Sequence, residues 1–173
     1  MANLTNDHFN AFGRITYGYA AVETGIKLCV SAMARIHAHD GFILSAPYPA
    51  QALANVAKVL ANENLKPELR KEMIGLVDRW IGHNLIRTYV AHHRWRDGAR
   101  PGAIRPTFYD VRTPNSVVKG FEDDEKDYTT AELFLLANNL HQLNEDVKAF
   151  FANSGLEAVL EKIDAEHSGQ API

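Results

Sequence analysis

The sequence predicts an all-α fold, an antiparallel helical bundle of about four to five helices with a small hairpin or loop insert between the third and fourth helices. Apolar residues recur at spacings of three and four along most of the chain, which is the pattern of amphipathic helices. The 173 residues are 46% hydrophobic, enough for the core of one domain. Residues of strand character gather only between positions 107 and 121. We expect a single helical domain over 1–166 and a frayed C-terminal tail over 167–173.

The first helix is expected to begin behind three good N-cap candidates, Thr5, Asn6 and Asp7, and to run to about Arg35. Three glycines lie inside this helix, and each costs about 1 kcal/mol relative to alanine, so they predict a close approach to another helix. They are Gly13, Gly18 and Gly25. Glu23 lies beside the apolar stripe and is either a surface charge or a buried partner for an arginine.

The segment His37-Ala38-His39-Asp40-Gly41 follows this helix. Its histidines and aspartate could offer metal ligands. Histidines also suit a helix C-terminus, and Gly41 suits the position just beyond one, so we favour a helix end. A turn over 45–49 leads to a shorter helix that ends near Asn62.

The third helix begins at Pro67, and its pattern persists to about Trp95. Gly75 and Gly82 are points where it could bend. Two polar rows at i, i+4 spacing run along its second half, and the neutral residues in them favour a functional face over a merely solvated one. The rows are Arg79, His83 and Arg87, and beside them Asn84, Thr88, His92 and Arg96.

Residues 96–102 break this helix, and 107–112, 113–116 and 117–121 read as strand, turn and possible return strand. Between Arg79 and Lys119, eight basic and two acidic side chains leave an excess of six positive charges. The acidic stretch 122–127 comes directly afterwards. It is either a solvated turn or a segment that lies over the basic region when no ligand is bound.

The fourth helix begins at a capping box, with Thr129 as N-cap and Glu132 at the third helical position. Its apolar pattern continues to Phe151, and Asn153-Ser154-Gly155 ends it. A last short helix is expected over 156–163.

Composition limits the setting of the protein. The net charge of −3 neither attracts nor excludes nucleic acid globally, so an anion site must be local. Cys29 is the single cysteine, and residues 1–20 carry no leader pattern, which predicts a cytoplasmic protein. No segment approaches the roughly 20 apolar residues of a spanning helix, so we expect no membrane association.

The stretch Ile86-Arg87-Thr88-Tyr89-Val90-Ala91-His92-His93-Arg94-Trp95 concentrates reactive side chains. It resembles the HEPN superfamily, all-α bundles whose motif is an arginine, four to six intervening residues and a histidine late in a helix. Here four residues separate Arg87 from His92. The Ala-His-His-x-Trp continuation, the insert and the Tyr128–Leu133 opening of a long helix also resemble bacterial members. The resemblance covers roughly residues 9–151.

The resemblance implies metal-independent RNA cleavage, often in toxin–antitoxin or phage-defence systems, by a homodimer that brings two motifs together. A histidine suits proton transfer with the RNA 2′-OH, and an arginine fork suits the charged phosphorane. The implied catalytic residues are Arg87 as oxyanion clamp, His92 as general base or acid, and Thr88, which orients the ring of His92. Arg87 and His92 differ by about 140° around an ideal helix, which a two-fold axis would overcome.

Residues flanking the motif are expected to stack on or neutralise single-stranded RNA. They are Tyr89, His93, Arg94, Arg96 and Arg100. We expect no cofactor and no metal at this site. An antitoxin or a nucleotidyltransferase-like protein is the partner that the resemblance implies.

Other interpretations stay open. Arg87 alone could pair with an acid such as Glu23, His92 alone could be a core histidine, and both tryptophans favour core or interface roles over base stacking. The second hypothesis is a non-catalytic HEPN-fold module that binds RNA or protein. A third is a metal-dependent hydrolase that uses His37, His39 and His92.

Overall fold

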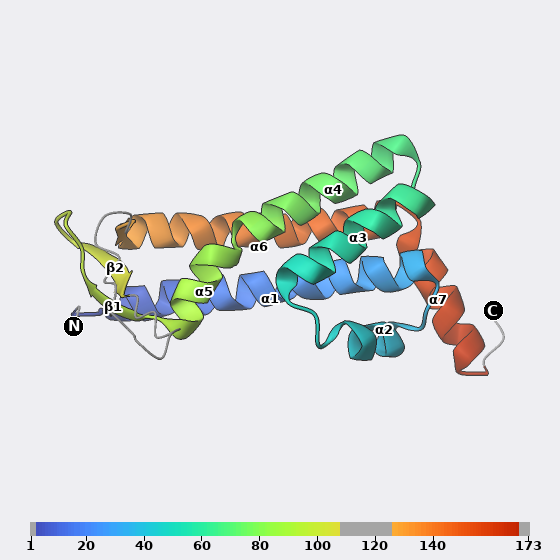
Figure 1. Cartoon of the computed structure of the whole chain (residues 1–173), viewed down its shortest axis with the longest axis horizontal. Helices are drawn as coiled ribbons and strands as arrows, with labels where there is room; N and C mark the ends of the chain where they lie inside the picture. Colours follow the sequence, from blue (N-terminus) through green and yellow to red (C-terminus); the bar gives the residue numbers. More distant parts are fainter. Residues whose placement is uncertain (1–2, 108–125, 170–173) are drawn as a thin grey trace, which may run out of the picture. The chain divides into compact units, whose positions relative to one another are not determined.

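The computed structural model describes residues 3–107 and 126–169, and these are mostly helical (Figure 1). Apart from Thr107, the predicted strands over 107–112 and 117–121 lie outside the described residues. The elements in chain order are α1 (Asn6–Ala34), α2 (Ala38–Ser45), α3 (Ala50–Asn64), α4 (Pro67–Gly82), α5 (Asn84–His92), β1 (Arg94–Asp97), β2 (Ala103–Thr107), β3 (Tyr128–Thr129), α6 (Thr130–Asn153) and α7 (Leu156–His167).

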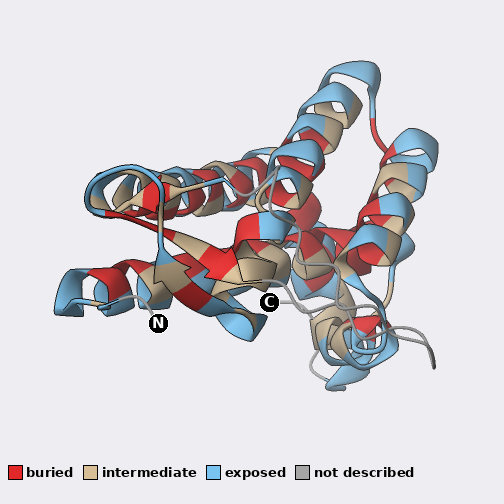
Figure 2. Ribbon diagram, turned by 60° about the vertical axis from the view of Figure 1, so that its left-hand side comes forward, coloured by how far each residue is buried: buried red, intermediate tan, exposed pale blue. Residues whose placement is uncertain are grey.

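The chain divides into two compact units. Unit 1 contains residues 1–17 and 85–139, and unit 2 contains 18–84 and 140–173. The helices α1 and α6 contribute residues to both units. Helices of both units carry a buried face and an exposed face (Figure 2), as the spacing of apolar residues predicts. The single domain over 1–166 stays a prediction.

Within unit 2, the parts of α1 and α6 that belong to it run in the same direction (Figure 1), so the expectation of a wholly antiparallel bundle is wrong for this pair. A Cβ added to Gly18 would lie 3.0 Å from the Cβ of Leu140, and one added to Gly25 would lie 2.6 Å from Cγ1 of Val147. Both contacts join residues 122 positions apart, so residue numbers rise together along the two helices. The glycines at 18 and 25 thus confirm the predicted close approach, whereas Gly13 has no neighbour within 4 Å of its added Cβ.

The helix α1 ends at Ala34, as predicted to within one residue, but the left-handed residue that follows it is Arg35 and not Gly41. Arg35 has a left-handed backbone (φ 55°), its N–H donates to the carbonyl of Ala32, and the N–H of Ile36 donates to that of Ser31. This is a Schellman arrangement, in which glycine is the usual left-handed residue. Gly41, expected to follow a helix end, instead lies inside α2, where an added Cβ would meet the hydroxyl of Ser31 at 1.9 Å.

Glu23 and Cys29, both on α1, lie in different environments. Glu23 pairs with Lys27 on the same helix, Oε1 to Nζ at 2.7 Å, which makes it a partly exposed helix-surface ion pair. Cys29 is fully buried, and burial raises the pKa of its thiol to about 12. The thiol is therefore unreactive at neutral pH.

The predicted third helix over 67–95 is interrupted. It ends at Gly82, where the N–H of His83 bonds back to Trp80 and Ile81 in a tight last turn, and a new helix begins at Asn84. The side chain of Asn84 accepts a hydrogen bond from the hydroxyl of Tyr19 at 3.0 Å. The polar rows predicted to run continuously from Arg79 into α5 are therefore broken at His83.

The chain leaves α5 as a strand rather than as a further helical turn. The three strands form an antiparallel sheet in the order β1-β2-β3, with Trp95 opposite Pro106 and Ile104 opposite Tyr128. Trp95 is 6% exposed, and its ring lies 4.8 Å from that of Phe12 and 6.1 Å from that of Tyr128. Burial of this indole in the core of unit 1 favours the strand over the predicted helix.

The capping box at the start of α6 is confirmed. The carboxylate of Glu132 accepts the backbone N–H of Thr129 at 2.7 Å, and the hydroxyl of Thr129 accepts the N–H of Glu132 at 3.2 Å. Across residues 3–107 and 126–169, none of the helices combines the length and the apolar character that crossing a membrane requires.

Candidate functional site

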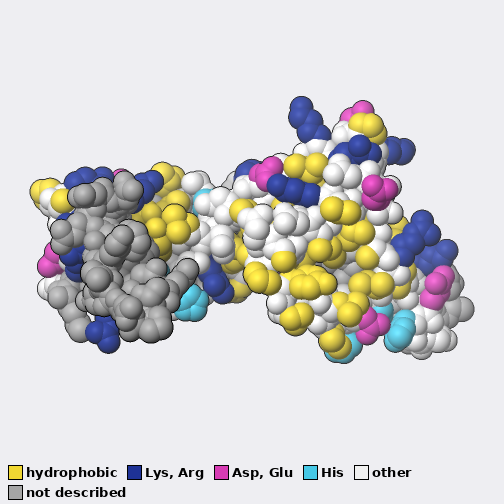
Figure 3. Space-filling model, in the orientation of Figure 1, with side chains coloured by type: hydrophobic (Ala, Val, Ile, Leu, Met, Phe, Trp, Pro, Cys, Tyr) yellow, Lys and Arg dark blue, Asp and Glu magenta, His cyan; other side chains and the backbone are white. Residues whose placement is uncertain are grey.

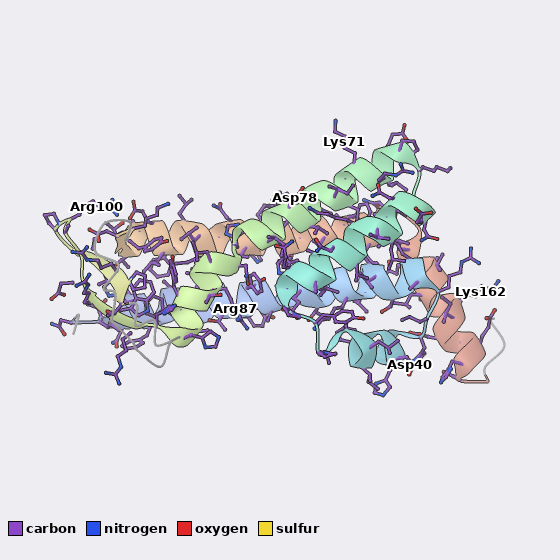
Figure 4. All side chains as sticks on the ribbon, viewed as in Figure 1. Asp40, Lys71, Asp78, Arg87, Arg100 and Lys162 are labelled. Atoms are coloured by element: carbon purple, nitrogen blue, oxygen red, sulfur yellow. The ribbon has the colours of Figure 1, made fainter. Side chains whose placement is uncertain are left out.

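The candidate catalytic residues lie on α5, in unit 1 except for its first residue (Figure 4). Ile86 is the buried anchor of this nine-residue helix. Arg87 and Thr88 are half-buried, and His92 is exposed at the C-terminal end. Thr88 precedes His92 by four residues, so both side chains lie on one face of the helix. This geometry leaves the imidazole accessible to a substrate, while the guanidinium is held closer to the protein.

The two adjacent histidines have different environments. His93, just beyond α5, is half-buried, and its ring packs edge-on against Tyr89 with 5.4 Å between ring centroids. Burial lowers the pKa of His93, and the neighbouring positive charge of His92 lowers it further. His93 is therefore neutral at pH 7 and supports the end of the helix, whereas His92 faces solvent.

Three arginines lie on one face of the sheet. Side chains alternate along a strand, so Arg94 and Arg96 lie on the face opposite the buried Trp95. Arg105 on β2 is directly across from Arg96 in the register. We call Arg94, Arg96 and Arg105 the basic sheet face. Sequence reasoning did not include Arg105 among the candidate site residues, because only the register of β1 against β2 brings it beside Arg96.

Like charges directly opposite each other destabilise a sheet unless acidic groups or a bound anion offset them. The Nε of Arg105 lies 3.7 Å from Oδ1 of Asp127, and this carboxylate supplies part of the negative charge that offsets the two arginines. Asp127 belongs to the acidic stretch expected either to be a solvated turn or to cover the basic region. Its carboxylate contacts that region, and residues 122–125 lie outside the described residues.

Arg100 has a structural role in the turn between β1 and β2. Its guanidinium binds both carboxylate oxygens of Glu132, at 3.0 and 2.7 Å, and donates to the carbonyl of Asp127 at 2.6 Å. The N–H groups of Ala99 and Arg100 donate to Asp127 Oδ2. Gly98 permits this approach, because an added Cβ would lie 2.8 Å from the carboxyl carbon of Asp127. An RNA phosphate would have to displace Glu132 from Arg100.

A hollow of about 640 Å³ in unit 1 lies beside this turn. Its lining includes Arg100, Asp97, Thr130 and His8, and neither Arg87 nor His92 belongs to it. His8 is buried and hydrogen-bonded at both ring nitrogens, to Thr5 and to Thr130. Two of the lining residues, His8 and Arg100, therefore make contacts that stabilise the fold.

The sequence-predicted residues thus fall into three groups. Arg87, Thr88, Tyr89 and His92 share α5, and His93 follows directly after it. Arg94 and Arg96 share the basic sheet face, and Arg100 is engaged by Glu132 in the turn. His37 and His39 belong to unit 2, whereas His92 belongs to unit 1. Comparison of the chain with protein-family models, curated proteins and solved structures finds no match.

Proposed function

We propose that this protein is a HEPN-type, metal-independent endoribonuclease that acts as a homodimer, with a toxin–antitoxin or phage-defence role. The observation that carries the proposal is the combination of α5 and β1. A half-buried arginine and an exposed histidine occupy one short helix, and a basic sheet face begins two residues later. Acid–base chemistry and phosphate binding are the two things that RNA cleavage requires.

The proposed reaction uses the RNA as its own nucleophile. His92 removes the proton of a 2′-OH, the 2′-oxygen attacks the adjacent phosphorus, and the bond from phosphorus to the 5′-oxygen breaks. The products are a 2′,3′-cyclic phosphate and a 5′-hydroxyl, which receives a proton. Arg87 offsets the charge that gathers on the non-bridging oxygens, and Thr88 orients the imidazole.

The decisive experiment incubates single-stranded RNA with the purified protein in EDTA. We expect cleavage, with cyclic-phosphate ends, and no cleavage of an oligonucleotide with 2′-deoxyribose throughout. His92→Ala and Arg87→Ala should each lower the rate by about 100-fold or more, the range for a lost acid–base group and for a lost group that stabilises transition-state charge, respectively. His141→Ala is the matched control, because His141 is an exposed histidine on α6 outside the candidate site. Uncut RNA from correctly folded, dimeric wild-type protein would refute the proposal.

Mixing the two inactive variants tests the homodimer. If Arg87 of one copy serves His92 of the other, a heterodimer of the two variants contains one intact site. Equal mixing after subunit exchange should then restore about a quarter of wild-type activity, because about half of the dimers are mixed and each has one working site. A mixture as inactive as its components would show that both residues act within one chain.

The basic sheet face favours a second candidate function, an RNA-binding module without catalysis. Arginines alone can hold a phosphate backbone, and they need no histidine to do so. This alternative predicts RNA binding that weakens with salt, that Arg94→Ala lowers, and that His92→Ala leaves unchanged.

A further inference from the structure

Three potential metal ligands converge in unit 2, on residues outside the candidate ribonuclease site. His37 precedes α2, Asp40 lies in the first turn of α2, and His167 ends α7. One ligand atom from each of these residues lies within 4.8 Å of the others. Histidine and acidic side chains gather in the region of α2 and α7 (Figure 3), and Figure 4 labels Asp40 on α2.

The ring of His37 is oriented by an acidic neighbour. Its Nε2 lies 3.4 Å from Oδ1 of Asp164, a carboxylate that also accepts the N–H of Ala38 at 3.1 Å. Its Nδ1 is buried and has no hydrogen-bond partner among the residues that the structure describes. Metal-binding histidines commonly have this arrangement, in which a carboxylate holds one nitrogen and the other is left for the ion.

We propose that His37, Asp40 and His167 bind a divalent transition metal of the Zn²⁺ type. Two imidazole nitrogens and a carboxylate oxygen are ligands that Zn²⁺ accepts, and three protein ligands leave a position open for water. Ligand atoms around tetrahedral Zn²⁺ are about 3.3 Å apart when each bond is about 2.0 Å. The observed separations of up to 4.8 Å require the ligands to close by about 1.5 Å.

The ligands can make this movement because Asp40 and His167 are exposed. The ring of His167 stacks on that of His37, with 4.5 Å between centroids, and must rotate to turn a nitrogen toward the ion. The charges around the cluster favour a cation. Asp40 and Glu166 line the adjoining hollow of about 630 Å³ together with Arg35, and Asp164 lies behind His37.

The metal would join the end of α7 to α2. Because binding to the folded state alone stabilises it, the midpoint of thermal unfolding should rise with Zn²⁺ concentration. This inference is independent of the proposed ribonuclease, since it uses none of the residues of α5 or the sheet.

The test is calorimetric titration of tag-free, chelator-treated full-length protein with ZnCl₂. We expect one Zn²⁺ per chain and a rise in the unfolding temperature. His167→Gln and Asp40→Asn should each weaken binding by at least about tenfold, and Asp164→Asn by about 10–100-fold, the usual effect of losing a group that orients a ligand. His141→Gln is the control and should bind like wild type.

Three results would overturn the proposal. They are no binding at 1:1 stoichiometry by protein whose circular dichroism is native, binding that survives both His167→Gln and Asp40→Asn, and binding that His141→Gln lowers equally. The two ligand substitutions are at exposed positions, and unfolding curves without zinc show whether each variant keeps its fold.

Discussion

The contact between Gly25 and Val147 gives a quantitative prediction for Gly25→Ala. The new Cβ would lie 2.6 Å from Cγ1 and 3.7 Å from Cβ of Val147. A valine in a helix strongly prefers one χ1 rotamer, so its methyl cannot move aside without cost. Overpacking of this kind costs about 1–3 kcal/mol, whereas replacing glycine by alanine in a helix gains about 1 kcal/mol. The free energy of unfolding should therefore fall, by up to about 2 kcal/mol.

Gly13→Ala is the matched control on the same helix. No atom lies within 4 Å of its added Cβ, so only the gain of about 1 kcal/mol in helix propensity applies. Urea denaturation of both variants, followed by circular dichroism, measures the difference. In the double variant Gly25→Ala/Val147→Ala the overlap disappears, so the loss should be smaller than the sum of the single losses. Equal stabilisation by Gly25→Ala and Gly13→Ala would refute the reasoning.

Three further predictions concern charge and backbone. Arg100 and then Thr129 lower the pKa of Glu132 from 4.5 to about 2, so its stabilising effect is complete above pH 4.5 and is lost as the pH falls toward 2. Acid-unfolding curves of Glu132→Gln should lack this loss of stability between pH 4.5 and 2. Identical acid-unfolding curves for the variant and the wild type would contradict the prediction. His92→Ala should raise the pKa of His93 in an NMR titration, because a positive neighbour is removed, while burial keeps the value below 6.5. Arg35→Gly should stabilise the protein by up to about 1 kcal/mol in urea denaturation, since it relieves a left-handed backbone, and a loss of stability would argue against the Schellman geometry.

Local sequence patterns predicted the local features of the fold. The spacing from Thr129 to Glu132 predicted the start of α6, because a capping box depends only on residues three apart. The glycines of α1 predicted a close approach at two of three positions. The direction of the neighbouring helix was not predictable in this way, because contacts such as Gly18 with Leu140 join distant parts of the chain.

Three local predictions failed because tertiary contacts outweighed them. Gly82 was one of two predicted bend points, and α4 ends there, but the apolar pattern runs past it without a gap and so did not predict that a new helix begins at Asn84. The pattern around Trp95 fits either a helix or a strand, and burial of its ring decides for the strand. Gly41 resembled a C′ residue but lies inside α2, where the hydroxyl of Ser31 leaves no room for a side chain.

The sequence predicted most residues of the candidate site, but it did not predict which of them lie side by side in the fold. The motif spacing identified Arg87 and His92, and α5 holds both. Arg105 lies on the strand after the motif, beyond the turn, and only the register of β1 against β2 joins it to Arg96. Arg100 was expected to bind RNA because of its charge, whereas its contacts with Glu132 depend on the fold of the turn.

Because α5 leads almost directly into β1, the number of residues between His92 and Trp95 decides which face of the strand carries the indole. A single residue inserted between His93 and Arg94 would turn the strand over, so that Arg94 and Arg96 would replace the indole in the core. Replacing one side chain at these positions has no such effect, because the alternation of the strand is kept. In a library of insertions and substitutions, the protein should therefore keep its fold with Arg94→Gln and lose it with a one-residue insertion between His93 and Arg94, even though that insertion leaves all natural side chains present.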